Sequence, residues 1–424
     1  MTTRIAKLQG LQILDSRGRP TVCALMELND GSIHKASVPS GASTGAHEAA
    51  ELRDHGSKFS EKYYSGTSVY QAISHINNEI APRLIGTEPS TLATDNLMVE
   101  LDSSLRHERI GANATLAVSL ATAKACAHLA GLSLAQFYQG AGPLLIPMPM
   151  VNILSGGAHA NGALDIQDVL VLPHGAKSFS QALSWVVAIR EMAAKAGAKK
   201  GFVTNLVADE GGLGIGFESS DQACAFVSEC IESVGLNPGV DVSIALDIAS
   251  TQFYSDGSYL SRNSGKKYSP SQWSDQLVEL VKAHPIISIE DPFAEDDWSS
   301  WNSFMNEVPP TLQVVGDDLF TTNLERLTKG ITEKSANSIL IKANQNGLIT
   351  HTHEVIKHAQ NNGFTTIVSA RSGETEDSWL SDIATGWSAG QIKVGSTHGS
   401  DRTAKWNRLL ELEATQECVF SQPF

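Results

Sequence analysis

The sequence of 424 residues is poor in cysteine, short of basic residues and without any long apolar run. Its five cysteines are scattered and form no C-x-x-C pair, which argues against a zinc site and favours buried, reduced thiols. No segment approaches the length of a membrane span, and the first residues, MTTRIAKLQGLQIL, lack the apolar core of a signal peptide. We therefore expect a cytoplasmic protein without a membrane partner.

Acidic residues outnumber basic ones, with 46 Asp and Glu against 31 Lys and Arg and a formal net charge of −15. This balance argues against nucleic acid and against an anionic membrane surface as partners. Hydrophobic residues make up 42% and charged residues 18% of the chain, which is ordinary for a globular protein. The length allows two domains with a sizeable core.

The first part of the chain begins with strand-like stretches and continues with helical ones. The strands are expected at Arg4–Leu14, Thr21–Leu28 and Ser32–Val38, and the helical pattern runs from Glu48 to Leu134. Three strands followed by helices predict an N-terminal α+β domain. The glycines and prolines of GAGPLLIPMP, Gly140–Pro149, predict a linker. We place the N-terminal domain at residues 1–138 and a second domain at residues 139–424.

In the second part, short apolar strands alternate with helical stretches such as Ser180–Gly197 and Ser271–Lys282. The strands are expected at Val169–Leu172, Phe202–Val207, Val242–Leu246, Ile286–Ile289, Gln313–Val315, Ser338–Ile341, Thr366–Ser369 and Gln391–Ile392. This alternation predicts a parallel sheet. The number of strands fits an α/β fold with a closed (β/α)₈-type barrel better than an open doubly wound sheet, which remains the alternative.

A charged residue ends each of the last six strands that carry this pattern. IISIEDP, Ile286–Pro292, shows the feature most clearly, since a buried strand delivers two acids to its end. The six residues are Asp247, Glu290, Asp317, Lys342, Arg371 and Lys393. In a parallel barrel the carboxyl ends of all strands open on one face, where barrel enzymes have their active sites. The pattern therefore predicts three acids and three bases around one mouth.

This set of charges indicates a type of chemistry. Three clustered carboxylates stay ionised only beside cations, so a hard divalent metal is expected, Mg²⁺ before others. Three bases opposite them would receive an anionic substrate, and a lysine whose pKa is lowered by a metal suits a general base. The predicted reaction is proton abstraction next to a carboxylate. The alternative is that each charge only solvates the end of its strand.

Ten short motifs follow one another through both parts of the chain. They are DSRGRPTV (15–22), PSGASTG (39–45), GGAHAN (156–161), DEGG (209–212), ALDIAS (245–250), SIEDP (288–292), GDDLF (316–320), IKANQ (341–345), RSGETED (371–377) and GQIKVG (390–395). With these motifs the chain resembles the enolase (phosphopyruvate hydratase) family over nearly its whole length. The resemblance implies an enolase-type barrel with an N-terminal capping domain, and a glycolytic hydro-lyase that converts 2-phosphoglycerate to phosphoenolpyruvate.

The resemblance also implies roles for single residues. It implies two Mg²⁺ ions, one held by Asp247, Glu290 and Asp317 and a second that involves Ser43. It implies Lys342 as the base at carbon 2 and Glu210 as the acid for the 3-hydroxyl. The substrate contacts that it implies are His159, Gln167, Asp168, Arg371, Ser372 and Lys393. Two of these have simple alternatives, because Ser43 could cap a helix and His159 could be a loop histidine.

A homodimer is expected from the same resemblance, with an octamer possible. Arg17, Glu48 and Arg402 resemble the surface through which enolases dimerise.

The chain departs from the family pattern on the leaving-group side. Enolases usually carry glutamate where this chain has Asp168, histidine where it has Ala370, and an acid where it has Gln252. A carboxylate on an arm shorter by one methylene, roughly 1.5 Å, is misplaced by enough to affect catalysis. An alternative is therefore a paralogue that dehydrates a phosphonate or carboxyphosphonate to a carboxyphosphonoenolpyruvate-like product in phosphonate biosynthesis. A second alternative is a non-catalytic structural or binding protein on the same fold.

Overall fold

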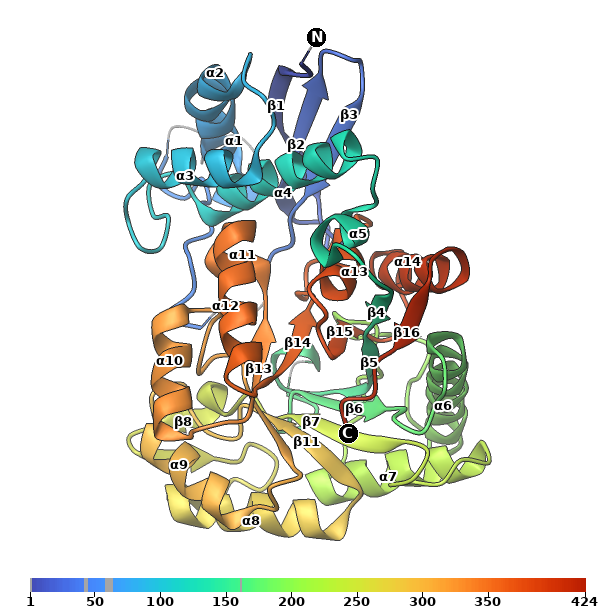
Figure 1. Cartoon of the computed structure of the whole chain (residues 1–424). Helices are drawn as coiled ribbons and strands as arrows, with labels where there is room; N and C mark the ends of the chain where they lie inside the picture. Colours follow the sequence, from blue (N-terminus) through green and yellow to red (C-terminus); the bar gives the residue numbers. More distant parts are fainter. Residues whose placement is uncertain (1, 42–44, 58–63, 161) are drawn as a thin grey trace.

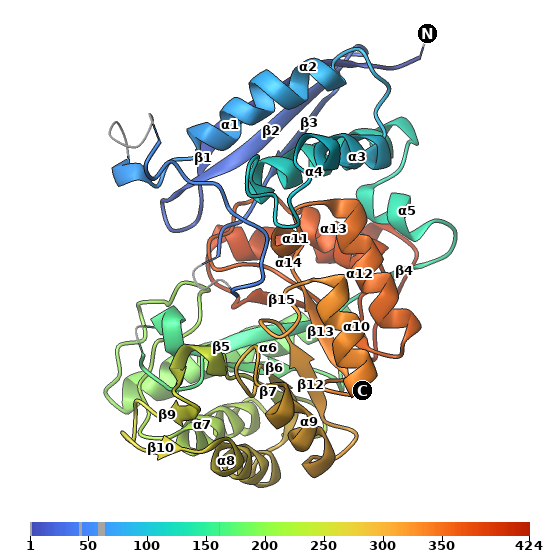
Figure 2. The same ribbon diagram turned by 90° about the vertical axis from the view of Figure 1, so that its left-hand side faces the viewer.

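The computed structural model describes residues 2–41, 45–57, 64–160 and 162–424. Its N-terminal part contains a three-stranded antiparallel sheet in the order β1-β2-β3, with helices packed on it (Figures 1 and 2). The strands are β1 Ile5–Leu14, β2 Pro20–Leu28 and β3 Ile33–Ser37. The helices are α1 Tyr70–His75, the π-helical turn Ile76–Ile80, α2 Ala81–Leu84, α3 Thr91–Leu101, α4 Ala112–Leu129 and α5 Leu134–Gln139, preceded by a 3₁₀ turn at Tyr64–Gly66. The predicted order of strands, then helices, is confirmed, but the expected helical start at Glu48 is wrong, since residues 48–57 form loop and turn and the first α-helix among the described residues begins at Tyr70.

Helix α4 joins this part to the rest of the molecule. It packs against β2 and β3 on one side and against α11, Ala343–Asn346, and α12, Ile349–Asn361, on the other. A helix with neighbours on both sides must be apolar or small all round, and fourteen of its residues are buried, seven of them alanines. In Figure 2 it lies between the N-terminal sheet and the helices above the barrel.

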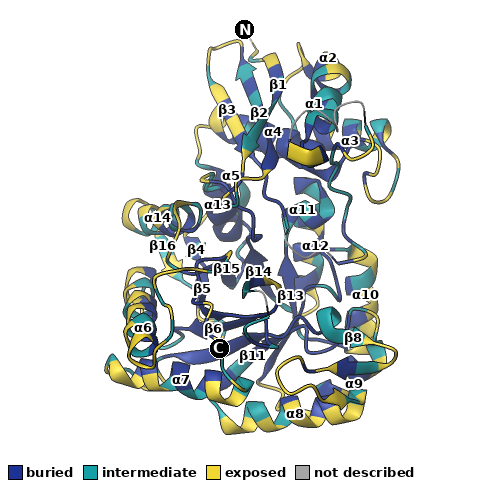
Figure 3. Ribbon diagram, turned by 180° about the vertical axis from the view of Figure 1, so that it is seen from behind, coloured by how far each residue is buried: buried dark blue, intermediate teal, exposed yellow. Residues whose placement is uncertain are grey.

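Eight strands close into a barrel in the order β11-β12-β13-β14-β15-β5-β6-β7. Their bounds are β5 Met148–Ser155, β6 Asp168–Leu172, β7 Ser243–Asp247, β11 Ile286–Glu290, β12 Gln313–Gly316, β13 Ser338–Ile341, β14 Thr365–Ser369 and β15 Gln391–Gly395. The predicted closed barrel is confirmed and the open sheet is excluded. Figure 3 shows these strands as buried, while the outer faces of the surrounding helices are exposed.

The outer ring is helical, and two small sheets complete the fold. The helices are α6 Phe179–Lys199, α7 Ser220–Ser233, α8 Pro270–Ala283, α9 Trp298–Glu307, α10 Leu324–Glu333, α13 Trp379–Gly386 and α14 Ser400–Thr415, with 3₁₀ turns at Gly157–Ala160 and Ser250–Phe253. The small strands are β4 Leu144–Ile146, which pairs with β16 Cys418–Phe420, and β8 Tyr254–Ser255, β9 Ser258–Leu260 and β10 Lys267–Tyr268. Several helices begin at serine caps, and Ser269 with Gln272 forms a complete capping box before α8.

Three expectations about the strands are wrong. The stretch Phe202–Val207 is an irregular loop with Val203, Leu206 and Val207 largely exposed, because no neighbouring element covers it. The expected linker Gly140–Pro149 instead supplies β4 and the start of β5. The barrel is also not fully parallel, since β6 is antiparallel to β5 and to β7.

The reversal of β6 has a simple cause. The connection from β5 to β6 contains only the 3₁₀ turn Gly157–Ala160 and no crossover helix, so the chain turns back beside itself. The first residue of β6 therefore lies at the mouth, where the other strands have their ends. Asp168 pairs in register with Asp247, the last residue of β7.

The barrel interior below the mouth is filled by side chains. An apolar layer contains Met148, Met150, Leu170, Leu172, Ala245, Val315, Leu340 and Ile367. Beside it the hydroxyl of Ser288 donates to Gln313, whose amide donates to Gln391, at 2.8 and 2.6 Å. The lone serine in the apolar strand IISIE is thus a buried hydrogen-bonding residue of the barrel.

All five cysteines are free thiols, as expected. Among the described residues, no helix combines the length and the apolar character that a transmembrane span requires.

Candidate active site

The mouth of the barrel brings together charged residues from successive strand ends. Asp247 and Glu290 are the last residues of β7 and β11, and their Cα atoms pair in register. The ammonium group of Lys393, in β15, lies between them and donates to Asp247 Oδ2 at 2.8 Å and Glu290 Oε2 at 2.7 Å. All three side chains are buried, so each charge depends on the others for compensation.

The second lysine compensates the third acid. Lys342, just after β13, donates from Nζ to Asp317 Oδ2, just after β12. Burial lowers the pKa of Lys342, but the nearby carboxylates, Asp317 foremost and Glu290 after it, together outweigh this effect, so the pKa is raised. The direction is opposite to the lowered value expected beside a metal, because here the nearest partner is an anion.

The acidic cluster fits a divalent cation. Burial and the neighbouring Asp247 raise the pKa of Glu290 well above its usual value, and its Oε1 atom is buried without any hydrogen-bond partner. A carboxylate oxygen left without a donor in a buried acidic cluster is a natural ligand for Mg²⁺, which prefers oxygen. Asp247, Glu290 and Asp317 are therefore candidate ligands, although the groups of three ligand-type side chains with atoms within 4.8 Å of one another, among the described residues, are His159–Asp168–Glu210 and Asp291–Asp317–Asp318.

Another acidic group lies close by but has a structural role. Oxygens of Asp291, Asp317 and Asp318 lie within 4.8 Å of one another. Both oxygens of Asp291 accept backbone N–H bonds, from Asp317 at 2.9 Å and Asp318 at 2.8 Å. Because these bonds occupy the carboxylate of Asp291, we assign this residue to the shape of the loop after β12 and not to the ion.

Beside Asp247, on the neighbouring strand β6 and the loops around it, the mouth contains a buried acid–histidine–acid group. His159 Nδ1 lies 2.9 Å from Asp168 Oδ2, and its Nε2 lies 3.5 Å from Glu210 Oε1. The hydroxyl of Ser372 bridges the second contact, at 3.1 Å from His159 Nε2 and 3.3 Å from Glu210. The structure thus brings four of the predicted site residues into one cluster.

The pKa values of this cluster identify where its proton is held. Burial lowers the pKa of His159, but Asp168 and Glu210 more than reverse this and raise it to about 9. Burial raises the pKa of Glu210, but His159 and Arg402 outweigh it and lower the value to about 2. At neutral pH the imidazole is therefore protonated and Glu210 is ionised.

Asp168 is held by its own hydrogen bonds. Asn152 and Ser155, both in β5, donate to Asp168 Oδ1, while His159 engages Oδ2. Burial raises the pKa of the Asp168 carboxyl, and these hydrogen-bond donors partly stabilise its ionised form. The short side chain is fully buried and is tied to the barrel wall.

Gln167 and Gln252 connect the two sides. Gln167 Nε2 donates to Asp247 Oδ2 at 3.2 Å, and its Oε1 accepts from Gln252 Nε2 at 2.5 Å. Gln252 follows β7, at the position where the family usually has an acid. Its amide N–H donates to the Gln167 oxygen, a bond that an ionised acid at this position could not make.

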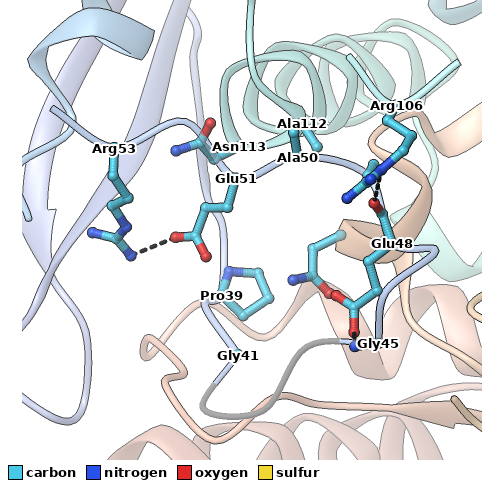
Figure 4. Close-up of a pocket in the computed structure, with 12 residues that line it drawn as sticks. Pro39, Gly41, Gly45, Glu48, Ala50, Glu51, Arg53, Arg106, Ala112 and Asn113 are labelled. Carbon is cyan, nitrogen blue, oxygen red and sulfur yellow. Dashed lines mark hydrogen bonds and ion pairs between the residues drawn. The ribbon is translucent and has the colours of Figure 1, made fainter. Parts of the chain in front are cut away.

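Arg371 forms its ion pair with a residue of the N-terminal part of the chain, while its charge also acts on Asp317 and Lys342. Its guanidinium contacts Glu48 at 2.8 and 3.2 Å and Asn344 at 3.0 Å. Glu48 also borders a hollow of about 290 Å³ that Glu51, Arg53, Arg106 and Asn344 help to line (Figure 4). The mouth therefore has an arginine corner beside the N-terminal part of the chain.

The predicted dimer surface is not supported by its three residues. The side chains of Arg17, Glu48 and Arg402 are buried within the single chain. Arg402 donates to the backbone carbonyls of Arg371, Ser372 and Val394 at 2.6 to 2.9 Å. These side chains stabilise the site from within, and this part of the prediction is wrong. The dimer itself remains a prediction.

Ser43, the predicted contact of a second Mg²⁺, lies outside the described residues. Sequence reasoning missed Asn152, Ser155, Asn344 and Gln345, all of which bond to site residues. Asn344 and Gln345 belong to the motif IKANQ, directly after Lys342, and that position was the available signal.

Comparison with family models gives two matches that together span nearly the whole chain. The enolase N-terminal domain matches residues 5–138, and the enolase C-terminal TIM barrel domain matches residues 143–420. Both agree with the two-part architecture and with the charged barrel mouth described above. The chain belongs to the enolase family.

Proposed function

We propose that the protein is a Mg²⁺-dependent hydro-lyase that dehydrates 2-phosphoglycerate to phosphoenolpyruvate. The observation that carries the proposal is the arrangement of the mouth. Three carboxylates with two lysines form one group, and a protonated histidine with an ionised glutamate forms a second group beside it. An elimination needs a base at one carbon and an acid at the next, and this division supplies both.

Lys342 is the proposed base, and Lys393 the contact for the substrate carboxylate. Mg²⁺ held by Asp247, Glu290 and Asp317 would supply positive charge to stabilise the dianion formed at carbon 2. A ligand role for Asp317 would weaken its interaction with the Lys342 ammonium group, which now keeps the proton on the lysine. The neutral amine of Lys342 would accept the proton from carbon 2.

The family resemblance implies Glu210 as the acid for the 3-hydroxyl, but Glu210 is ionised in this cluster, so we propose His159 in its place as the source of the leaving-group proton. The C–O bond at carbon 3 breaks, its electron pair leaves with oxygen, and a proton from the His159–Glu210 pair completes the water molecule. The electrons of the former C–H bond form the double bond between carbons 2 and 3. Asp168 keeps the imidazole protonated beforehand. Arg371 and Ser372 are the proposed phosphate contacts.

The test is a mixture of purified protein, 2-phosphoglycerate and Mg²⁺, followed by the ultraviolet absorbance of the enol phosphate. We expect a Mg²⁺-dependent rise that Lys342→Ala abolishes. If absorbance does not rise, incubation in D₂O followed by analysis of carbon 2 separates two cases. Exchange without dehydration means that only the base side acts on this substrate, and absence of both signals refutes 2-phosphoglycerate as the substrate.

A second candidate substrate class is favoured by the leaving-group side. Asp168 is tied to β5, and Ala370 is a buried methyl group where the family usually has an imidazole. These two differences leave the carboxylates and lysines unchanged. A related phosphonate or carboxyphosphonate acid, dehydrated by the same two steps, would be tested in the same assay. We also propose that the protein is cytoplasmic and forms a homodimer.

A further inference from the structure

Glu48 is the meeting point of three parts of the mouth. Its carboxylate accepts from Arg371 at 2.8 and 3.2 Å, from the backbone N–H of Gly45 at 3.0 Å and from Gln345 Nε2 at 3.4 Å. The adjacent N–H of Ala49 donates to the carbonyl of Gln345 at 2.8 Å. Figure 4 shows Glu48 on the segment that leads into the N-terminal part. Glu48 is buried, so these donors take the place of water.

The amide of Gln345 has one orientation that satisfies its neighbours. Thr322 Oγ1 accepts from the backbone N–H of Lys342 at 2.9 Å and donates its own proton to Gln345 Oε1 at 2.7 Å. The amide oxygen is thus occupied, and the NH₂ group faces the two carboxylates. It donates to Asp317 Oδ1 at 2.9 Å and to Glu48 Oε1 at 3.4 Å.

These bonds determine how Asp317 is presented. Lys342 holds one carboxylate oxygen and Gln345 holds the other. Lys342 has a chemical task that requires it to change partners, whereas Gln345 has none. The amide is therefore the contact that keeps the plane of the Asp317 carboxylate fixed when the lysine moves.

We propose that Gln345 and Glu48 are positioning residues for Asp317, and that the Arg371–Glu48 ion pair fixes the metal carboxylate through them. The inference rests on the proposed function, because it takes Asp317 as a Mg²⁺ ligand. It links the arginine corner of the mouth to the metal side by contacts that involve neither substrate nor ion. Neither residue touches the reacting atoms.

The experiment titrates Mg²⁺ into the full-length, metal-free protein by calorimetry, without substrate. Gln345→Met keeps the length of the side chain and removes both donors, and we expect Mg²⁺ affinity to fall by about 10-fold or more. Glu48→Gln should cause a smaller loss. In the double variant Glu48→Gln should add almost nothing, because Glu48 reaches Asp317 through Gln345.

Glu51→Gln is the matched control. Glu51 is on the same segment and pairs with Arg53 and Ser40, and its negative charge also acts on Arg371, as that of Glu48 does. It measures what the loss of one nearby negative charge does by itself. Thermal unfolding of each variant checks the fold, and Gln345→Leu, which also removes both donors and adds no charge, is measured beside Gln345→Met.

Three results would overturn the inference. Unchanged Mg²⁺ affinity in both Gln345 variants would show that the amide does not position Asp317. Additive losses in the double variant would mean that Glu48 acts by charge alone. Wild-type protein that binds no Mg²⁺ would refute the proposed function itself, and this outcome is distinct from the other two because it appears before any substitution is made.

Discussion

The His159–Asp168 pair gives the sharpest test of the site. Asp168→Asn keeps the shape of the side chain and the acceptor for Asn152 and Ser155, but it replaces the oxygen beside His159 Nδ1 with an NH₂ donor. A donor at that position favours an unprotonated Nδ1. The variant therefore removes the strongest force that keeps the proton on His159, and burial, which opposes the proton, becomes dominant.

The size of the effect follows from the pKa of His159. This value is raised from 6.5 to about 9, and a difference of that size corresponds to about 3 kcal/mol in favour of the protonated folded state. Because the folded pKa exceeds the unfolded one, this stabilisation is fully present below pH 6.5. It disappears as the pH rises through 9. In Asp168→Asn we expect the pKa to fall below 7 and the slope of stability between pH 6.5 and 9 to flatten.

The assay is an NMR titration of isotope-labelled histidines between pH 5 and 10, with unfolding temperatures recorded over the same range. The control is Asp165→Asn in the same β5–β6 connection, whose carboxylate accepts from Ser261, Arg262 and Asn263 and does not contact His159. The control should leave the His159 titration unchanged. A His159 pKa that stays above 8 in Asp168→Asn would refute the argument.

Two further predictions concern charge and packing at the mouth. Lys393→Met leaves Asp247 and Glu290 facing each other without a cation, so the metal-free protein should lose about 3–5 kcal/mol of stability. Mg²⁺ should restore much of this stability. An equal loss with and without Mg²⁺ in calorimetric unfolding would contradict this prediction. Gly212→Ala places a Cβ 2.5 Å from Ser155 Oγ and 2.9 Å from Asn152 Oδ1, the two side chains that hold Asp168. We expect a loss of about 1–3 kcal/mol and a lower turnover, whereas Gly214→Ala, whose nearest contact is 3.5 Å away, should match the wild type in thermal unfolding and rate assays.

The sequence was sufficient to predict the charged mouth. Asp247, Glu290 and Lys342 lie at or directly after strands whose apolar runs stand out between helical stretches. A run of buried residues that ends in a charged residue is visible in the local sequence. Because parallel barrel strands have their carboxyl ends on one face, the charged ends of several strands are expected to lie together there. This is why residues distant in sequence could be grouped before their positions were known.

The remaining features depend on contacts that a local pattern does not contain. The direction of β6 follows from a connection without a helix, and β5 contains Pro149, a residue typical of turns. Phe202–Val207 has the composition of a strand, but no neighbouring strand pairs with it. The Glu48–Gln345 contact joins residues from opposite parts of the chain, and only the folded structure brings them together.

The reversed strand β6 also makes one half of the mouth a single local unit. Asn152, Ser155, His159, Gln167 and Asp168 all come from β5, β6 and the connection between them. The carboxylates and lysines, in contrast, come from elements spread over the rest of the barrel. Exchange of residues 148–172 between relatives would replace much of the proposed leaving-group side at once. The carboxylates at the ends of β7, β11 and β12 would remain unchanged. Under the proposed mechanism, substrate preference could diverge through this one hairpin while the residues proposed to abstract the proton stay unchanged.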